Sequence, residues 1–203
     1  NLSASEIYRQ VVYISKKCLE VYNQPLTNIV FMGMGEPLLN YKNVLRSIHF
    51  ITSEEGLNMS YKRITLSTSG ISKMIRKLAD DNVKVNLALS LHAANEELRK
   101  KIMPIGKSNT LEEIRDSLKY YFSKTKKKVT YEYVLLRDVN DSIEDAYQLY
   151  KYTKHLSSKV NIIEYNAVEG LEFKKSSFEK TEKFIGYLLK KGVNVSLRRS
   201  RGK

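Results

Sequence analysis

Glu36 is the first residue in this sequence that could bind a ligand or take part in a reaction. It is a carboxylate that directly follows two closely spaced glycines. In NIVFMGMGEPLLN (residues 28–40), an apolar run leads into Gly33 and Gly35, and Glu36 comes next. Glycine tolerates positive φ and lets a ligand approach the backbone, and a carboxylate there can accept hydrogen bonds from an ammonium or hydroxyl group. A plain turn with Glu36 at a helix N-terminus explains the same residues, because negative charge is favoured there. The residues alone leave both interpretations open.

Hydroxyl, imidazole and amide groups follow three further apolar runs. ITLSTSG contains Ser67 and Ser69, LALSLH ends with Ser90 and His92 around a leucine, and Asn166 follows VNIIEY. Each group has an ordinary structural explanation, because a serine can cap the next helix and a histidine is most often a hydrogen-bonded structural residue. His92 could also be an acid–base group or a ligand. Taken one at a time, these motifs predict no particular reaction.

Alternating helix and strand patterns must position these groups. Apolar periodicity predicts helices over residues 4–22, 41–55, 71–80, 111–124, 142–156 and 178–191. Short apolar runs predict strands over residues 28–32, 63–67, 84–91, 129–136, 160–165 and 193–197. This alternation favours parallel strands with crossover helices, in an open α/β sheet or a (β/α) barrel, with functional groups at the carboxyl ends of the strands. Because the sequence begins with a helix, we expect a preceding strand to be missing.

Polar residues in these strands share faces. With a period of two, Asn86, Ser90 and His92 lie on one side of their strand, and Glu164 and Asn166 lie on one side of theirs. A closed eight-stranded barrel fills its interior with bulky aliphatic side chains. The polar faces therefore predict a partial barrel whose inner face lines a ligand cavity.

Net charge indicates a class of partner. The 203 residues carry 35 lysines and arginines against 22 acidic residues, which gives a net charge of +13. The basic residues cluster at positions 99–101, 124–128, 174–175, 190–191 and 198–203. Such runs suit a polyanion, most simply nucleic acid, although a lysine-rich proteome would decorate a surface in the same way.

Cysteine content and hydropathy narrow the remaining classes. Cys18 is the only cysteine, which excludes an internal disulfide and indicates a cytoplasmic protein. It falls in an apolar helical pattern with Val11, Ile14 and Val21, so we expect a buried thiol. No paired histidine or cysteine spacing exists, so the chain's own side chains predict no metal site. No stretch is apolar and long enough to span a bilayer.

Five ordered motifs resemble one family. FMGMGEPLLNYKNVL, KRITLSTSGI, VNLALSLHAANEELRKKIMPI, VTYEYVLLRDVND and VNIIEYNAVEG are similar to the radical S-adenosylmethionine (SAM) methyltransferases of the RlmN family, which modify adenine C2 in 23S rRNA and in tRNA. The terminal SLRRSRGK resembles the start of that family's last strand. The related Cfr type, which methylates adenine C8 in rRNA, shares much of this pattern. The EPLLN and STSG segments are closer to the C2 type.

The resemblance implies a site for SAM. The residues that match the family's SAM-binding positions are Gly35, Glu36, Ser67, Ser90, Leu91, His92 and Asn166. In this family the carboxylate at the position of Glu36 faces the ammonium of the methionine moiety. The implied fold is a partial (β/α)6 radical SAM barrel that lacks its first strand, with residues 1–203 forming one domain truncated at both ends.

Two departures from the family pattern limit what these residues can do alone. The CxxxCxxC motif, whose thiolates bind a [4Fe–4S] cluster, is absent, and Cys18 by itself cannot replace it. The family's C-terminal cysteine, which takes a methyl group from one SAM, lies beyond Lys203. We therefore assign no catalytic residue and no metal ligand within residues 1–203 and place the cluster ligands outside them. These residues alone are expected to be inactive.

For a longer parent protein, the resemblance implies a cytoplasmic monomer without membrane attachment. Its partners would be 23S rRNA, tRNA and an electron donor such as flavodoxin, and its cofactors SAM and a [4Fe–4S] cluster. Besides the Cfr type, two other interpretations remain. A parent without the cluster motif would be a non-catalytic RNA- or SAM-binding module. An ordinary (β/α) barrel enzyme would bind a phosphate or sugar at the same strand ends, but this leaves the five motifs unexplained.

Overall fold

Parallel strands form the framework of the protein. The computed structural model describes residues 1–33, 35–103 and 109–199. Six strands form one sheet whose order, β1-β2-β3-β4-β5-β6, follows the chain. The pairs β1–β2, β4–β5 and β5–β6 are parallel, which confirms the predicted α/β class. The strands are β1 (Ile29–Phe31), β2 (Ile64–Thr68), β3 (Asn86–Ser90), β4 (Val129–Leu135), β5 (Ser158–Glu164) and β6 (Val195–Arg198).

Helices connect the strands. All the predicted helices form, with ends shifted by up to about three residues, as is usual for boundaries. The short α4, η1 and η2 are not predicted, because a few residues give too little periodicity. Within the described ranges, no helix has both the length and the apolar composition needed to cross a bilayer. The helical elements are α1 (Ala4–Tyr22), η1 (Pro37–Asn40), α2 (Tyr41–Thr52), η2 (Tyr61–Arg63), α3 (Ser72–Asp80), α4 (Glu96–Ile102), α5 (Leu111–Thr125), α6 (Ile143–Thr153) and α7 (Phe178–Lys190).

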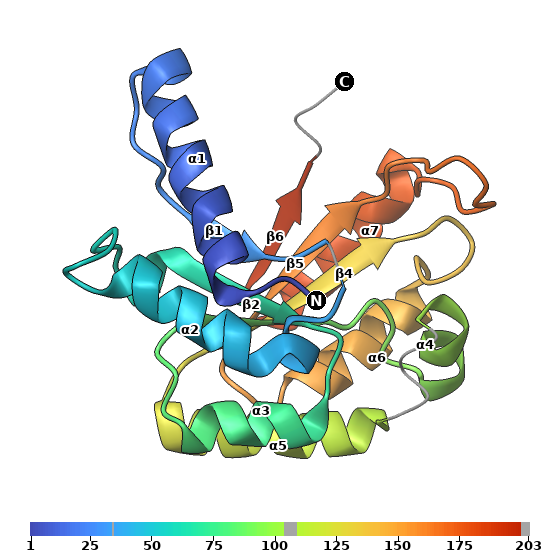
Figure 1. Cartoon of the computed structure of the whole chain (residues 1–203). Helices are drawn as coiled ribbons and strands as arrows, with labels where there is room; N and C mark the ends of the chain where they lie inside the picture. The colour runs from blue at the N-terminus through green and yellow to red at the C-terminus, as the bar shows by residue number, and fades with distance from the viewer. Residues whose placement is uncertain (34, 104–108, 200–203) are drawn as a thin grey trace. The chain divides into compact units, whose positions relative to one another are not determined.

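The chain divides into two compact units. The first comprises Asn1–Thr68 with Asn82–Leu87, and the second comprises Ser69–Asp81 with Ala88–Lys203. In the first unit, α1 begins at a capping box in which the Ser3 hydroxyl accepts from Glu6 N–H and the Glu6 carboxylate accepts from Ser3 N–H. α1 lies beside α2 (Figure 1). The buried apolar side chains of α2 and β2 are Val44, Ile48, Ile51, Ile64 and Leu66.

The apolar face of α1 is only partly covered. Val11 is buried, but Ile14 and Val21 are 48% and 65% exposed, and Cys18 is half-buried. The expectation of a buried thiol is therefore wrong. Apolar spacing along a helix shows which side chains share a face, but it does not show that another element covers that face.

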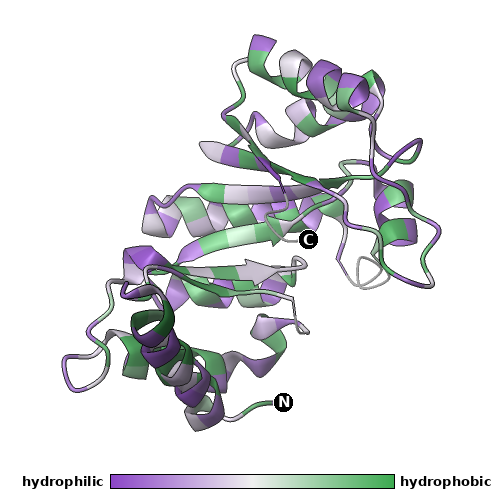
Figure 2. Ribbon diagram, turned by 90° about the horizontal axis from the view of Figure 1, so that it is seen from above, coloured by the Kyte–Doolittle hydropathy of each residue, from purple (hydrophilic) through white to green (hydrophobic). Residues whose placement is uncertain are grey.

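In the second unit, β4, β5 and β6 have one apolar face and one polar face. The ring of Tyr133 on β4 packs against Phe184 of α7, with 5.5 Å between centroids. Glu132 alternates with Tyr133, and the register pairs it with Asn161 and pairs Asn161 with Ser196. Figure 2 shows the hydrophobic segments of the strands and the mixed character of the helices. The polar face of β5 is the one that carries Asn161, whereas Glu164, for which alternation predicted a polar face, lies on the side of the buried Val160 and Ile162. The face predicted for β5 is therefore the wrong one.

The second unit packs closely around Gly70. It has φ +101°, and a Cβ atom there would lie 2.7 Å from Ile114 Cδ1 and 3.1 Å from Leu89 Cδ1. Gly170 has φ +83°, but a Cβ atom there would meet nothing within 4 Å. Both alanine substitutions strain the backbone, and only Gly70→Ala also overpacks the core. We expect Gly70→Ala to lower the free energy of unfolding by about 1–3 kcal/mol more than Gly170→Ala in urea denaturation. Equal losses would contradict this packing.

Candidate functional site

Glu36 is fixed by the turn in which it lies. After β1, Gly33 and Gly35 have φ of 96° and 74°, and Glu36 caps the η1 turn. Its Oε1 accepts a hydrogen bond from Leu38 N–H at 3.0 Å. A Cβ atom added at either glycine would meet no atom within 4 Å, so the space beside the turn is open. The turn interpretation is confirmed, and the half-buried carboxylate lies in a turn that a ligand could approach.

Ser67 lies at the same end of the first unit's strand pair. In the parallel register, Phe31 of β1 pairs with Leu66, and Ser67 is the next residue of β2. The η1 turn also contacts β2. Ser67 is buried, with 4% of its surface exposed. The first unit therefore gathers Ser67 with the turn that carries Gly35 and Glu36, as expected for residues at the carboxyl ends of parallel strands.

His92, in the second unit, follows β3 and replaces a backbone acceptor. Its φ of +56° lies in the left-handed region, so the chain turns away from the strand there. The N–H groups of Leu91 and His92 both donate to the Glu132 carbonyl, at 3.0 and 3.3 Å. The next amide of β4, Val134 N–H, donates to His92 Nδ1 at 3.1 Å. The imidazole thus takes the place that a strand carbonyl would occupy opposite β4.

These contacts keep His92 neutral. An amide N–H can only donate, so Nδ1 carries a lone pair and the ring proton lies on Nε2. Burial, together with the positive charge of Arg99, lowers the pKa of His92 from 6.5 to about 4. Of the three roles that the sequence left open, the structural hydrogen-bonded role is the one these contacts support.

Asn140 ties the end of β4 to the end of β3. This fully buried side chain donates from Nδ2 to the carbonyls of His92 and Val134, at 2.7 and 2.8 Å. Its Oδ1 accepts from Leu136 N–H at 2.7 Å, and its backbone carbonyl accepts from the Tyr133 hydroxyl at 3.0 Å. Both amide protons are used within the protein, so Asn140 belongs to the framework of the site.

Arg99 is a part of this framework that the motifs do not reveal. It lies in the basic run 99–101, which the charge pattern assigned to a nucleic-acid surface, yet it is only 1% exposed. Its guanidinium donates to the carbonyls of Ser69 at 2.5 Å, Leu91 at 3.2 Å and Ser90 at 3.5 Å. The assignment of Arg99 to the exposed basic surface is therefore wrong. A buried arginine among lysines has no distinct sequence signal, because its partners are backbone carbonyls.

A row of polar side chains crosses the second unit's strands. Asn161 Nδ2 donates to Glu132 Oε1 at 2.9 Å, and the Ser196 hydroxyl donates to Asn161 Oδ1 at 2.5 Å. Glu132 is 5% exposed, and burial raises the pKa of its carboxyl group. None of the three follows from the motifs. The signal that could have found Glu132 is its place between two aromatic residues, Tyr131 and Tyr133, in a buried strand.

The remaining predicted residues differ in accessibility. Ser90 is half-buried, and Asn166 is exposed in the loop after β5. Leu91 is fully buried, its N–H donates to Glu132, and its carbonyl accepts from Arg99. Leu91 can therefore serve a ligand only by shaping the strand end. Because β4 lies between β3 and β5, strand pairing does not bring Asn166 to the SLH segment.

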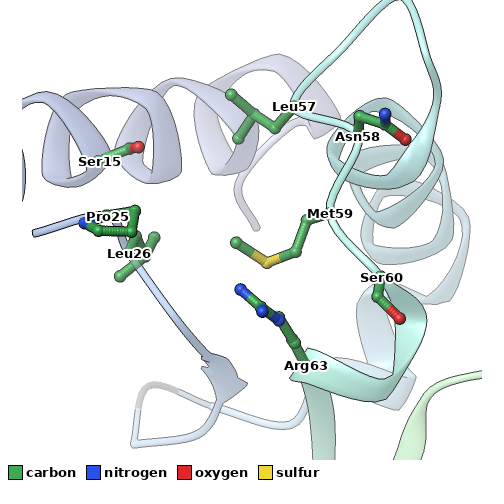
Figure 3. Close-up of a pocket in the computed structure, with 8 residues that line it drawn as sticks. All are labelled: Ser15, Pro25, Leu26, Leu57, Asn58, Met59, Ser60 and Arg63. Atoms are coloured by element: carbon green, nitrogen blue, oxygen red, sulfur yellow. The ribbon is translucent and has the colours of Figure 1, made fainter.

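Two of the cavities lie away from the predicted residues. One in the first unit has a volume of about 430 Å³, and the side chains of Met59 and Arg63 project toward it (Figure 3). Another in the second unit, of about 310 Å³, includes Arg137 and Lys175. The first cavity is lined by Ser15, Pro25, Leu26, Leu57, Asn58, Met59, Ser60 and Arg63.

In the part of the chain that the structure describes, no group of three or more His, Cys, Asp or Glu side chains could hold a metal ion.

Comparison with known proteins assigns the chain to a family. The model of the radical SAM superfamily matches residues 5–150, which is more than half of the sequence. The chain belongs to the radical SAM superfamily. The six-stranded parallel sheet, with its motifs at the strand ends, agrees with this assignment.

Similar members of the radical SAM superfamily cover the whole chain. It is 53% identical over 203 residues to the "Probable dual-specificity RNA methyltransferase RlmN" of Flavobacterium psychrophilum and 50% identical to that of Christiangramia forsetii. Each match covers 100% of this chain and 58% of the relative. A crystal structure of a radical SAM methyltransferase from Sphaerobacter thermophilus has a TM-score of 0.96 at 38% identity, over 100% of this chain and 59% of that one. The resemblance to the RlmN family is confirmed, and the chain spans a little over half the length of these relatives.

His92 makes stability depend on pH. Because its pKa is lowered to about 4 in the folded state, the unfolded state binds more protons between about pH 4 and 6.5, and stability falls as the pH falls through this range. His92→Gln keeps a side-chain acceptor for Val134 N–H but cannot titrate. We expect its free energy of unfolding, measured in urea, to decline less steeply from pH 6.5 to 4 than that of the wild type. Identical pH profiles would show that His92 is not held neutral.

Loss of Arg99 should destabilise the protein far more than loss of a neighbouring lysine. Arg99→Met keeps a long apolar stem but removes the donors to three backbone carbonyls, so we expect a loss of about 2–4 kcal/mol in the free energy of unfolding. Arg99→Lys restores one ammonium and should recover part of this loss. The exposed Lys101→Met is the matched control and should change stability by less than about 0.5 kcal/mol. A change at Arg99 as small as that of the control would contradict its role.

Proposed function

We propose that the protein to which this chain belongs is an RlmN-type methyltransferase, which uses SAM to methylate adenine C2 in 23S rRNA and tRNA. The observation that carries the proposal is 53% identity over all 203 residues to a protein named as a probable dual-specificity RNA methyltransferase RlmN. The chain spans 58% of that relative, so the activity is assigned to the longer protein. The EPLLN and STSG segments favour the C2 type over the C8 type.

We assign the binding of SAM to the residues matched by motif, with Leu91 acting only by shaping the strand end. Glu36 suits the methionine ammonium, because the Leu38 N–H orients its carboxylate in a turn. The open space at Gly33 and Gly35 suits the close approach of a ligand to the backbone. Bound SAM supplies the methyl group, and the residues of this chain bind and orient it. The proposed set is Gly35, Glu36, Ser67, Ser90, Leu91, His92 and Asn166.

A neutral His92 suits a cationic cofactor. SAM carries a sulfonium, and a protonated imidazole in the SLH segment would repel it. With its pKa lowered to about 4, His92 stays uncharged at neutral pH and keeps Nε2–H as a hydrogen-bond donor. The hydrogen bond from Val134 to Nδ1 thus gives the site a polar side chain without adding positive charge.

The residues of this chain do not fit a [4Fe–4S] cluster. Such a cluster is bound by several cysteine thiolates, and Cys18 on α1 is the only cysteine in the sequence. We propose that the cluster ligands and the catalytic cysteines lie outside residues 1–203, which form a truncated radical SAM core. No step of the reaction is assigned to a catalytic residue of this chain.

The proposed methyltransferase function also implies binding partners for the full-length protein. We assign RNA binding to the exposed basic surface, including the predicted run 124–128, since a net charge of +13 favours a polyanion. Residues 200–203 of the last basic run lie outside the described residues. A cytoplasmic location, a monomeric state and an electron donor such as flavodoxin complete the proposal.

The decisive test is methylation by the full-length protein. In a bacterial strain that lacks its own adenine-C2 methyltransferase, the protein should restore 2-methyladenosine to 23S rRNA and tRNA, measured by mass spectrometry of digested RNA. Formation of 8-methyladenosine alone would assign the protein to the Cfr type. Binding of SAM and RNA without any methylated adenine would assign it to the non-catalytic module.

Glu36→Gln connects this activity to the proposed site. The amide keeps an oxygen for the Leu38 N–H but loses the charge that the ammonium requires, so SAM affinity should fall about tenfold or more. The fold should be unaffected, as measured by thermal melting. Glu54→Gln, an exposed change in the same unit, is the matched control and should keep both the affinity and the methylation.

A further inference from the structure

Three helices of the second unit end beside one another at the end of the sheet that lies away from the proposed SAM residues. A helix that connects two parallel strands runs opposite to them, so the C-termini of α5, α6 and α7 lie at the amino ends of β4, β5 and β6. The proposed SAM residues follow the carboxyl ends of the strands. Since β5 has seven residues, and a strand rises about 3.3 Å per residue, the two ends of the sheet are about 20 Å apart.

The segments that meet at these amino ends carry no acidic residue. Residues 117–131, 146–163 and 183–199 contain lysine but neither aspartate nor glutamate. The acidic residues of α5, α6 and α7 lie in the first half of each helix, where the helix dipole favours negative charge. Charge is therefore separated along the three helices. The acidic residues concerned are Glu112, Glu113, Asp116, Glu144, Asp145, Glu179 and Glu182.

Two of the lysines converge on one tyrosine ring. Lys154 and Lys191 are the C-cap residues of α6 and α7, and their ammonium nitrogens lie 5.8 and 5.9 Å from the ring centroid of Tyr150. Lys191 Nζ also lies 5.7 Å from the ring centroid of Tyr187. An aromatic ring attracts an ammonium group without neutralising its charge. Two positive charges are thus held near each other at the surface.

No carboxylate compensates these two charges. Lys154 and Lys191 are exposed, and neither forms an ion pair with any residue that the structure describes. The C-terminal ends of two helices carry partial negative charge, which explains how the cations can gather there without an acidic side chain. Both ammonium groups remain available to an anionic partner.

Lys119 extends this basic surface onto α5. Loss of hydration and, after it, the charges of Lys154 and Lys119 lower the pKa of the exposed His155, so both lysines lie near this ring. Lys119 is 3.7 Å from Asp116, but both side chains are about half exposed, so this ion pair is weak. We call the group the lysine patch, and its members are Lys119, Tyr150, Lys154, His155, Tyr187 and Lys191.

We propose that the lysine patch binds the phosphate backbone of an RNA substrate at a point remote from the adenine that is methylated, and that Tyr150 holds its two C-cap lysines in place. Lysines that neutralise phosphates release counterions, which favours binding. Ammonium groups already positioned over a ring lose less freedom when the RNA arrives. The proposal rests on the proposed function, which supplies the RNA and places the reacting adenine near SAM. Because about 20 Å separate the two ends of the sheet, only an RNA that extends beyond the reacting adenine can reach the patch.

A phosphate backbone suits the patch better than a lipid surface does. A helix that binds in a membrane interface buries a continuous apolar face beside its lysines. Among the described residues in the last turns of α6 and α7, only Leu189 is a large exposed apolar residue. The patch therefore offers charge but little apolar surface.

The test removes the charge of the patch from the full-length protein. The patch variant combines Lys119→Gln, Lys154→Gln and Lys191→Gln. Its binding to a 23S rRNA transcript, and to a short hairpin that contains the target adenosine, is measured by fluorescence anisotropy at several salt concentrations. We expect about tenfold or weaker binding of the transcript and a decrease of about two to three in the slope of log K against log salt. Hairpin binding should stay within about twofold of the wild type, because charges about 20 Å away are screened.

A control variant separates the position of the charges from their number. It combines Lys16→Gln, Lys62→Gln and Lys73→Gln, which remove the same charge from exposed positions outside the predicted basic runs. This variant should bind the transcript within about threefold of the wild type. Equal losses in the patch and control variants would show that net charge alone matters and would overturn the proposal.

Two substitutions of Tyr150 test the ring. Tyr150→Phe keeps an aromatic ring and should bind the transcript as the wild type does. Tyr150→Leu keeps an apolar side chain without the ring and should bind about two- to fivefold more weakly. Equal affinities of these two variants would refute the role of the ring. Thermal melting identifies a variant that fails to fold, and the Tyr150→Phe and Tyr150→Leu pair then carries the comparison.

The remaining outcomes distinguish this proposal from the others. Equal losses for the transcript and the hairpin would place the patch at the reacting adenine and overturn the remote contact. Unchanged RNA binding, with loss of binding to phosphatidylserine vesicles, would assign the surface to a membrane instead. A wild-type protein that binds RNA but forms no methylated adenine would refute the proposed function, and the loss of transcript binding by the patch variant would still support the contact.

Discussion

The end of β3 depends on the hydrogen bond from Val134 N–H to the imidazole of His92. When a strand turns away from a sheet, the backbone N–H groups of the adjacent strand lose their hydrogen-bond acceptors. Buried backbone N–H groups rarely remain without an acceptor. His92 resolves this conflict because its side chain accepts what its backbone no longer can. The carbonyls released at the same point are also taken up, that of His92 by Asn140 and those of Ser90 and Leu91 by Arg99.

The result is a strand end that is rigid before any ligand binds. The side chains of Arg99 and Asn140 bond to the consecutive carbonyls of the SLH segment, and the His92 side chain bonds to β4, so the segment has little freedom to rearrange. A site that is already ordered loses less conformational entropy on binding. The same contacts explain why His92, which is not a glycine, can adopt a left-handed backbone conformation, since the surrounding hydrogen bonds hold its backbone.

The features predicted from the sequence are those that follow from the residue pattern within one helix or strand. The features that were missed depend on contacts with other elements. Alternation and helical periodicity predicted the helices and the parallel sheet, because those follow from the geometry of single elements. The motif around Glu36 predicted a strand-end turn, and the structure adds that Leu38 N–H orients the carboxylate. The pattern could not predict the burial of Arg99, whose partners are carbonyls from two other segments, or the exposure of the apolar face of α1. Both depend on what packs against an element.

The net charge of the sequence likewise does not show which charged residues are exposed. The net charge of +13 counts residues, but the structure gives them different roles. Arg99 is enclosed by carbonyls, Lys180 pairs with Asp138 and Asp141 at 2.6 and 3.3 Å, and Lys124 lies 5.5 Å from the ring centroid of Tyr120. Arg99 cannot meet a phosphate backbone, so the basic surface available to a polyanion is smaller than the composition suggests.

The order of the strands also bears on how the protein is made. Because the sheet runs β1-β2-β3-β4-β5-β6 in both space and sequence, each strand pairs with the one synthesised just before it. The pairings of β1 with β2, β4 with β5 and β5 with β6 join residues 29 to 35 positions apart, which is less than pairing strands from distant parts of the chain would require. As the ribosome releases these residues in order, the described sheet can therefore grow by one strand and one crossover at a time.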